Sequence, residues 1–195
     1  MKKNNSFLLK VMFATFFLAA SFMLAQQNYT ISTKVPDSSR HYTDIPYKTV
    51  DGKKVALDIF LPKTQDQKSF PVVIQIHGGG WVEGNKDIPA DTYTEKTVLQ
   101  FLHNGFAVVS IDYRLASKEV HFPAMIEDTK DAIRWVRKNA AQYGFDTHNI
   151  GTWGGSAGGH LALLAAYSAD SDFVGDADLA HYSSKCNYVL DNFGP

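Results

Sequence analysis

The stretch Gly151–Leu161 reads GTWGGSAGGHL and decides how the rest of the chain is interpreted. It holds the pattern G-x-S-x-G, with Gly154 and Gly158 two residues on either side of Ser156. A short strand is expected just before the pattern, and an Ala/Leu-rich helix over 159–169 just after it. A serine in such a turn is exposed at a helix N-terminus, where N–H groups favour a developing negative charge. The pattern therefore predicts that Ser156 is a nucleophile.

A phosphate-binding loop is the alternative for this glycine-rich turn. The dinucleotide pattern G-x-G-x-x-G occurs nowhere in the chain. The spacing from Gly154 to Gly159 resembles a Walker loop, but His160 follows where that loop requires a lysine. The sequence therefore favours the nucleophile.

Short apolar runs alternate with amphipathic stretches along most of the chain. The expected strands cover 55–61, 71–76, 107–111, 149–153 and 187–190, and the expected helices cover 92–104, 125–143 and 159–169. Because the strand runs lack polar alternation, they predict a mostly parallel sheet covered by helices on both faces, an α/β fold with three α/β/α layers. Functional residues of such sheets lie just after the strands, at their carboxyl ends.

A second strand end carries His77–Trp81, which reads HGGGW. Its three glycines allow backbone N–H groups to reach one substrate oxygen without interference from side chains. His77 is interpreted as a structural histidine that holds this loop by hydrogen bonds, not as a catalytic base.

A third strand end carries Asp112, Tyr113 and Arg114, with Phe122 soon after them. Asp112 and Arg114 are expected to form a hydrogen-bonded pair that braces the loop. The aromatic rings of Trp81, Tyr113 and Phe122 are expected to line a partly aromatic site.

These motifs together resemble the α/β-hydrolase fold. The matching segments are HGGGW (77–81), DYRL (112–115), FPA (122–124), AIRWV (132–136) and GGSAGGHLA (154–162). Within that fold the chain resembles the esterase/lipase branch that contains hormone-sensitive-lipase-like carboxylesterases, acetyl esterases, BD-FAE-type feruloyl esterases and kynurenine formamidase. The resemblance covers residues 47–195.

The resemblance implies ester hydrolysis through an acyl-enzyme on Ser156. It further implies that the N–H groups of Ala157, Gly79 and Gly80 form the oxyanion hole, while a contribution from Gly78 stays open. It implies no metal and no organic cofactor. The substrate would be a small-molecule or carbohydrate-linked ester.

This sequence departs from the family pattern at its C-terminal end. The family's triad runs Ser, then Asp or Glu, then His, yet only 39 residues follow Ser156. We therefore expect the acid and base beyond Pro195, a fold that is incomplete at the C-terminus, and little activity from this chain alone. A substituted triad of His181 and Asp191 is the weaker alternative, because neither side chain is placed at a strand end that faces the serine.

Two further function classes stay open. One is a serine peptidase or amidase of the same fold, although prolyl peptidases usually carry tyrosine where this chain has Ala157. The other is a binding module or remnant without catalysis.

Composition excludes several partners. With 19 Lys and Arg against 20 Asp and Glu, the chain has a net charge of −1 and no basic patch for nucleic acid. Cys186 is the single cysteine, so no intrachain disulfide forms, and no Cys/His spacing matches a zinc site. The sequence does not indicate an oligomeric state.

The N-terminus has the pattern of a secretory signal peptide. Lys2 and Lys3 precede an apolar run over 11–25, which is shorter than the roughly 20 residues of a membrane-spanning helix. Cleavage after Ala25, or near 19–21, would export the chain to the periplasm or the medium with no stable membrane anchor. An uncleaved anchor is the alternative. The expected organisation is a signal peptide over 1–25, a leader over 26–46 and the hydrolase domain over 47–195.

Overall fold

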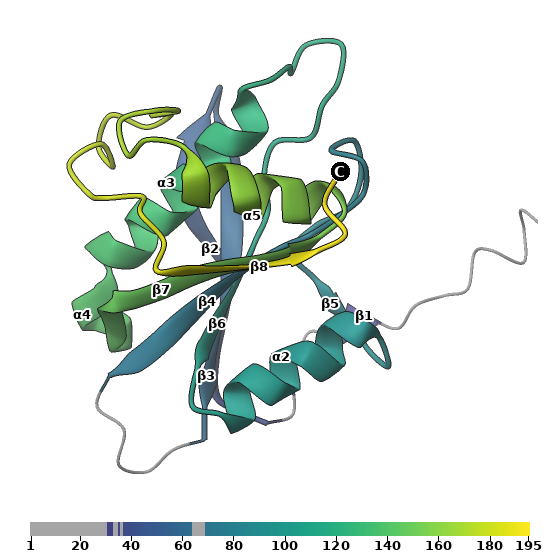
Figure 1. Ribbon diagram of the computed structural model, residues 1–195, viewed down its shortest axis with the longest axis vertical. Coiled ribbons are helices and arrows are strands. Elements are labelled where there is room, and N and C mark those ends of the chain that lie inside the picture. Colours follow the sequence, from purple (N-terminus) through teal and green to yellow (C-terminus); the bar gives the residue numbers. More distant parts are fainter. Residues whose placement is uncertain (1–30, 33–34, 36, 64–68) are drawn as a thin grey trace, which may run out of the picture. The chain divides into compact units, whose positions relative to one another are not determined.

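The structure is a computed structural model that describes residues 31–32, 35, 37–63 and 69–195. The expected signal peptide, residues 1–25, lies outside the described residues. From residue 31 onward the chain forms one compact unit. Its main sheet has six strands in the order β2-β3-β6-β4-β7-β8 (Figure 1).

Four neighbouring strands form the parallel part of this sheet. They are β4 (Phe70–Ile76), β6 (Ala107–Ile111), β7 (Phe145–Gly155) and β8 (Tyr188–Asn192). Each corresponds to a predicted strand, so the mostly parallel sheet is confirmed. The parallel arrangement brings the carboxyl ends of β4 and β7 to one edge, since Ile76 is in register with Gly154.

The other side of the sheet is antiparallel. β2 (Ser38–Val50) pairs with β3 (Lys53–Pro62), and β3 pairs with β6. The expected leader over 26–46 is therefore wrong for residues 38–46, which belong to the sheet. Two short strands, β1 (Ile31–Ser32) and β5 (Ile88–Pro89), pair separately.

Helices cover both faces of the sheet. α3 (Ala124–Lys138) and α5 (Ala157–Tyr167) lie on one side, and α2 (Tyr93–His103) lies on the other (Figure 1). A short helix, α4 (Ala140–Tyr143), follows α3, so the helix expected over 125–143 is divided at its end.

The alternation of β4 side chains builds one core on each face. Val72, Ile74 and Ile76 belong to the cluster that contains residues of α3 and α5. Val73 belongs to the cluster that contains Val98 of α2. All four β4 side chains are fully buried. The three-layer arrangement therefore follows from a strand that is apolar on both sides.

Candidate active site

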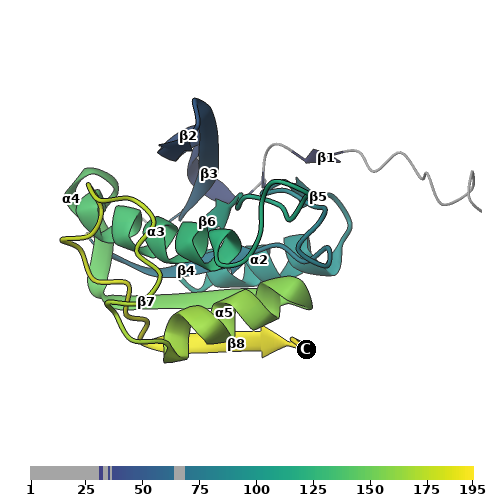
Figure 2. The ribbon, with the colours of Figure 1, turned by 90° about the horizontal axis from the view of Figure 1, so that it is seen from above.

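Ser156 occupies a sharp turn between β7 and α5. Its backbone has φ 53° and ψ −124°, a conformation that residues with a side chain rarely adopt. The serine is exposed although Gly154 and Ala157 on either side are buried. Its N–H donates to the carbonyl oxygen of Asn192 at 3.0 Å, which ties the turn to the end of β8. Figure 2 shows α5 running beside β8, with its first turn at the end where β8 stops.

The flanking glycines allow α5 to touch the end of β4. A Cβ on Gly154 would lie 2.8 Å from the carbonyl oxygen of Ile76, and one on Gly158 would lie 2.6 Å from that of His77. Neither distance leaves room for a methyl group. The glycines of G-x-S-x-G thus bring the HGGGW segment beside Ser156.

The glycine loop folds back on itself next to the serine. The N–H groups of Val82 and Glu83 both donate to the carbonyl oxygen of Gly79 at 3.1 Å. Gly79 and Gly80 have φ values of 111° and 59°, which suit glycine.

Three backbone donors remain available around this loop. Among the described residues, we find no hydrogen bond donated by the N–H of Gly79, Gly80 or Ala157. Their role as oxyanion donors stays a prediction, but the fold places both contributing segments beside the serine.

His77 lies beneath the loop and is structural in its contacts. Its side chain is buried, its Nδ1 lies 2.7 Å from the carbonyl oxygen of Gly78, and its ring stacks on Tyr113 at 4.2 Å. Burial lowers the pKa of His77 and so favours the neutral ring, in which a proton on Nδ1 donates to the carbonyl oxygen of Gly78. The ring contacts thus join the loop to Tyr113, as expected for a structural histidine.

Contacts of the third strand end differ from the expectation. Arg114 does not pair with Asp112; it binds Asp128 instead, with Nε and Nη2 each 2.8 Å from a carboxylate oxygen. Asp112 accepts the backbone N–H of Lys86 at 2.7 Å. Burial raises the pKa of Asp112, and the Lys86 hydrogen bond opposes that rise.

The three aromatic side chains expected to line the site do not line the cavity beside the elbow, and their contacts differ. Tyr113 is buried and donates to the carbonyl oxygen of His77 at 3.1 Å, so it supports the loop from behind. Trp81 is half-buried and meets the ring of His160. Phe122 is exposed and packs edge-on against Phe173 at 5.7 Å.

Within the described part of the chain, no base is hydrogen-bonded to the hydroxyl of Ser156, neither His160 nor His181. His181 is exposed in the loop that follows the far end of α5 (Figure 1). Asp191 accepts the N–H of Gly194 at 2.9 Å, so its carboxylate closes the end of β8. These contacts give no support to the substituted triad.

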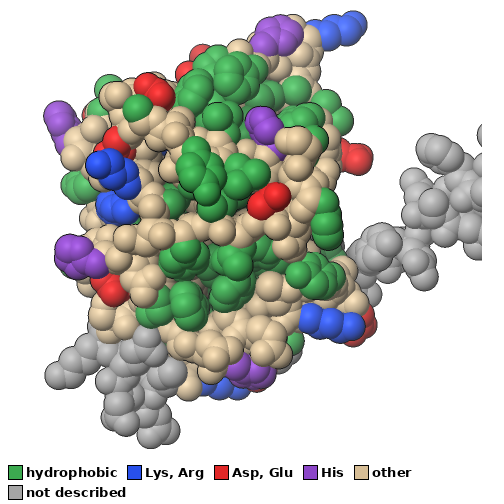
Figure 3. Space-filling model, in the orientation of Figure 1, with side chains coloured by type: hydrophobic (Ala, Val, Ile, Leu, Met, Phe, Trp, Pro, Cys, Tyr) green, Lys and Arg blue, Asp and Glu red, His purple; other side chains and the backbone are tan. Residues whose placement is uncertain are grey.

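A cavity of about 380 Å³ opens beside the elbow. Gly78 and Gly155 form part of its wall, and Tyr93 and Asn192 form another part. The Nδ2 of Asn192 donates to the hydroxyl of Tyr93 at 3.2 Å, which joins α2 to the end of β8 across this cavity. Hydrophobic side chains gather on the neighbouring face, between β8 and α2 (Figure 3).

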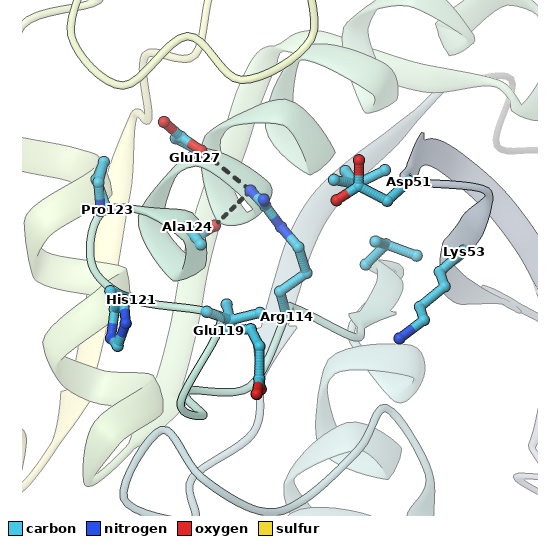
Figure 4. Close-up of a pocket in the computed structure, with 11 residues that line it drawn as sticks. Asp51, Lys53, Arg114, Glu119, His121, Pro123, Ala124 and Glu127 are labelled. Carbon is cyan, nitrogen blue, oxygen red and sulfur yellow. Dashed lines mark hydrogen bonds and ion pairs between the residues drawn. The ribbon is translucent and has the colours of Figure 1, made fainter.

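A second cavity, of about 420 Å³, lies between the β2–β3 turn and the segment before α3 (Figure 4). Its lining includes charged and titratable side chains of both signs: Asp51, Lys53, Arg114, Glu119, His121 and Glu127. Arg114 is fixed there by Glu127 at 3.0 Å and by the carbonyl oxygen of Ala124 at 3.2 Å. None of the predicted site residues lines this cavity.

In the ranges 31–32, 35, 37–63 and 69–195, no group of three or more His, Cys, Asp or Glu side chains is arranged to hold a metal ion. Nor does this part of the chain contain a helix of the length and hydropathy needed to span a membrane.

Comparison with known proteins agrees with this geometry. The family model BD-FAE matches residues 57–195. The esterase LipQ of Mycobacterium tuberculosis is 40% identical over 141 residues, which are 70% of this chain and 32% of LipQ.

Two solved esterase structures have the same fold. A thermophilic esterase of Thermogutta terrifontis superposes with a TM-score of 0.68 at 28% identity, covering 83% of this chain and 54% of that one. A truncated carbohydrate esterase from gut microbiota superposes with a TM-score of 0.66 at 33% identity, covering 82% and 58%.

The chain thus spans about a third of the length of LipQ and little more than half of each solved structure. The matched region contains the serine elbow, the glycine loop and the sheet that positions them. On these findings, the chain belongs to the BD-FAE family within the α/β-hydrolase fold.

Proposed function

We propose that this protein cleaves carboxylic esters through an acyl-enzyme formed on Ser156. One observation carries the proposal: an exposed serine with a strained backbone stands beside a glycine loop in which the N–H groups of Gly79 and Gly80 donate to no described residue. The similarity to esterases supports the same chemistry.

The chemistry follows from this arrangement. The Oγ of Ser156 attacks the ester carbonyl carbon while a general base takes its proton, and the carbonyl oxygen becomes an oxyanion. The N–H groups of Gly79, Gly80 and Ala157 stabilise that oxyanion. When the tetrahedral intermediate collapses, the base returns the proton to the leaving oxygen and the alcohol departs. Water, activated by the same base, then releases the acid from the serine.

A base and an orienting acid are needed to activate the serine. The described residues place no histidine against the hydroxyl. We propose that both groups come from outside the described residues, since this chain spans only 32% of LipQ. The 195-residue chain by itself should then be nearly inactive.

Ser156→Ala in the full-length protein tests the function. Hydrolysis of p-nitrophenyl acetate and butyrate should fall to the background rate, because no nucleophile remains. Ser39→Ala is the matched control, since Ser39 is an exposed serine on β2 that donates to the carbonyl oxygen of Leu61. Unchanged turnover in Ser156→Ala would exclude the assignment.

A finer proposal concerns the alcohol part of the ester. We infer a sugar, because a carbohydrate esterase is among the similar structures and several charged side chains line the cavity beside Arg114, which follows β6 in the chain. An acetylated oligosaccharide should then be cleaved with a higher kcat/KM than p-nitrophenyl acetate. Preference for simple aryl esters would contradict a sugar, and cleavage of anilides would favour the amidase alternative.

We also propose that the protein is exported. The support is the sequence of residues 1–25, with two lysines before an apolar run. N-terminal sequencing of the protein recovered from the periplasm or medium should start at Gln26. An intact Met1 in the membrane fraction would instead indicate an uncleaved anchor.

A further inference from the structure

Trp81 and His160 connect the two segments that carry the proposed oxyanion donors. Trp81 follows the glycines of the loop, and His160 lies on the first turn of α5, four residues after Ser156. Their rings meet edge to face, with centroids 5.3 Å apart and planes at 86°. Residues four apart share one face of a helix, so His160 lies below the serine on the side that faces the loop.

The backbone at Trp81 is held in an unusual conformation. Its φ is 64°, a value that is rare for a bulky residue. Backbone conformations of this kind typically cost about 1–3 kcal/mol. Its carbonyl oxygen accepts the N–H of Ala116 at 2.7 Å, and its ring packs against the main core cluster. These contacts hold the indole ring against the first turn of α5.

The His160 ring makes its contact through packing. Its Nδ1 is buried and has no hydrogen-bond partner among the described residues. Its backbone N–H donates to the carbonyl oxygen of Ser156 at 3.0 Å, as the first turn of the helix requires. The imidazole is therefore held in the fold by its neighbours, of which the Trp81 indole is one, and not by a hydrogen bond of Nδ1.

We propose that the Trp81–His160 contact is a positioning device for the oxyanion hole. It fixes the loop donors, Gly79 and Gly80, relative to the helix donor, Ala157, so that all three point at one substrate oxygen. This inference rests on the proposed function. Trp81 and His160 act through the backbone and are positioning residues, because small displacements of donors are costly for the rate.

A double-mutant cycle on the full-length esterase tests the contact. Trp81→Ala and His160→Ala should each lower kcat about 10- to 100-fold, below the loss of two to three orders typical for a whole donor, with KM within about threefold. The double variant should be no worse than the more severe single variant, because one contact is lost in each case. His160→Phe should restore most of kcat, since it keeps a ring against the indole.

Val82→Ala is the matched control. Val82 follows Trp81 in the same loop, but its side chain is 62% exposed, so kcat should stay within about twofold. Thermal unfolding of every variant separates loss of positioning from loss of folding. Additive effects in the double variant, or a His160→Phe enzyme as slow as His160→Ala, would overturn the proposal.

A second readout separates this inference from the proposed function. A fluorophosphonate reacts with an activated serine and develops negative charge on its phosphoryl oxygen, so its labelling rate on Ser156 also depends on the oxyanion hole. Rates lowered in both alanine variants and restored in His160→Phe would support positioning, even for an enzyme without a known ester substrate. Labelled wild type with unchanged rates in the variants would overturn positioning alone, and an unreactive wild type would overturn both.

Discussion

Gly78 lies directly against Ser156. A Cβ built on Gly78 would stand 2.9 Å from the carbonyl oxygen of Gly155 and 3.7 Å from the Cβ of Ser156. The first glycine of the loop therefore defines the space above the nucleophile. Residue 78 must be small because the backbone of the glycine loop and that of the elbow approach each other here. This requirement does not depend on whether the N–H of Gly78 is an oxyanion donor.

Gly78→Ala should lower kcat at least about tenfold, because the methyl group must push the loop or the elbow away from its position. Gly78 has an ordinary φ, so the substitution adds crowding without backbone strain. Steady-state kinetics with p-nitrophenyl butyrate, together with the unfolding temperature, provide the measurement. A kcat within twofold of wild type would show that the elbow and loop are not in close contact.

Gly158→Ala should destabilise the fold by about 3 kcal/mol or more, because its Cβ would overlap the carbonyl oxygens at the end of β4. Gly155→Ala is the control, since its Cβ would meet its nearest neighbour at 3.6 Å, an ordinary contact. Urea unfolding, or the soluble yield if Gly158→Ala does not fold, measures the difference. Equal stability of the two variants would contradict the backbone contact between α5 and β4.

Stability should decrease as the pH falls below the ordinary pKa of histidine, about 6.5. Burial lowers the pKa of His77 in the folded state, so the unfolded chain takes up a proton at a higher pH than the folded chain does. The contribution of neutral His77 to the free energy of unfolding is therefore complete only above pH 6.5. Urea unfolding at pH 5.5 and 7.5 should show a larger loss for wild type than for His77→Gln. An identical loss in both proteins would mean that His77 is not the group involved.

Asp128→Asn should cost about 3–5 kcal/mol, because Asp128 is fully buried between Arg114 and Lys48, whose Nζ lies 2.8 Å from its Oδ1. Glu127→Gln provides the comparison, since it removes a carboxylate from the same arginine at a partly exposed position. Its cost should stay near 1 kcal/mol or less. Chemical denaturation of both variants checks the ranking, and a costlier Glu127→Gln would reverse our reading of this network.

The strands of the parallel sheet could be predicted because each is apolar on both faces. β2 could not, and its pairing with β3 gives the reason: register shifts occur between Ser38 and Arg40, Tyr42 and Ile45, and Pro46 and Lys48. Bulges of this kind break the two-residue alternation by which a half-buried strand is recognised. The segment therefore had the pattern of an irregular leader.

The burial of charged side chains on α3 could not be predicted from the sequence either. Ile126, Ile133 and Val136 recur at helical spacing, and all three lie in the core. Lys130 and Arg134 are buried as well, because they donate to the carbonyl oxygens of Ala169 and Asp170 in the loop after α5. Those partners are distant in sequence, so no local pattern predicts these hydrogen bonds.

At the site itself, residue types and spacing were sufficient for the elbow and the glycine loop. They were insufficient to predict the partner of Asp112, which is the backbone N–H of Lys86. Because nearly every residue has a backbone N–H, the residue type does not indicate which one a carboxylate will accept. The contact between Trp81 and His160 was missed for a similar reason. It depends on a positive φ at a tryptophan, which no residue type indicates.

The most direct test of the central claim is to treat the folded full-length protein with a fluorophosphonate and map the modified peptide by mass spectrometry. We predict one adduct, on Ser156, that disappears in Ser156→Ala. An adduct on another residue, or none at all, would contradict a nucleophilic serine at this elbow.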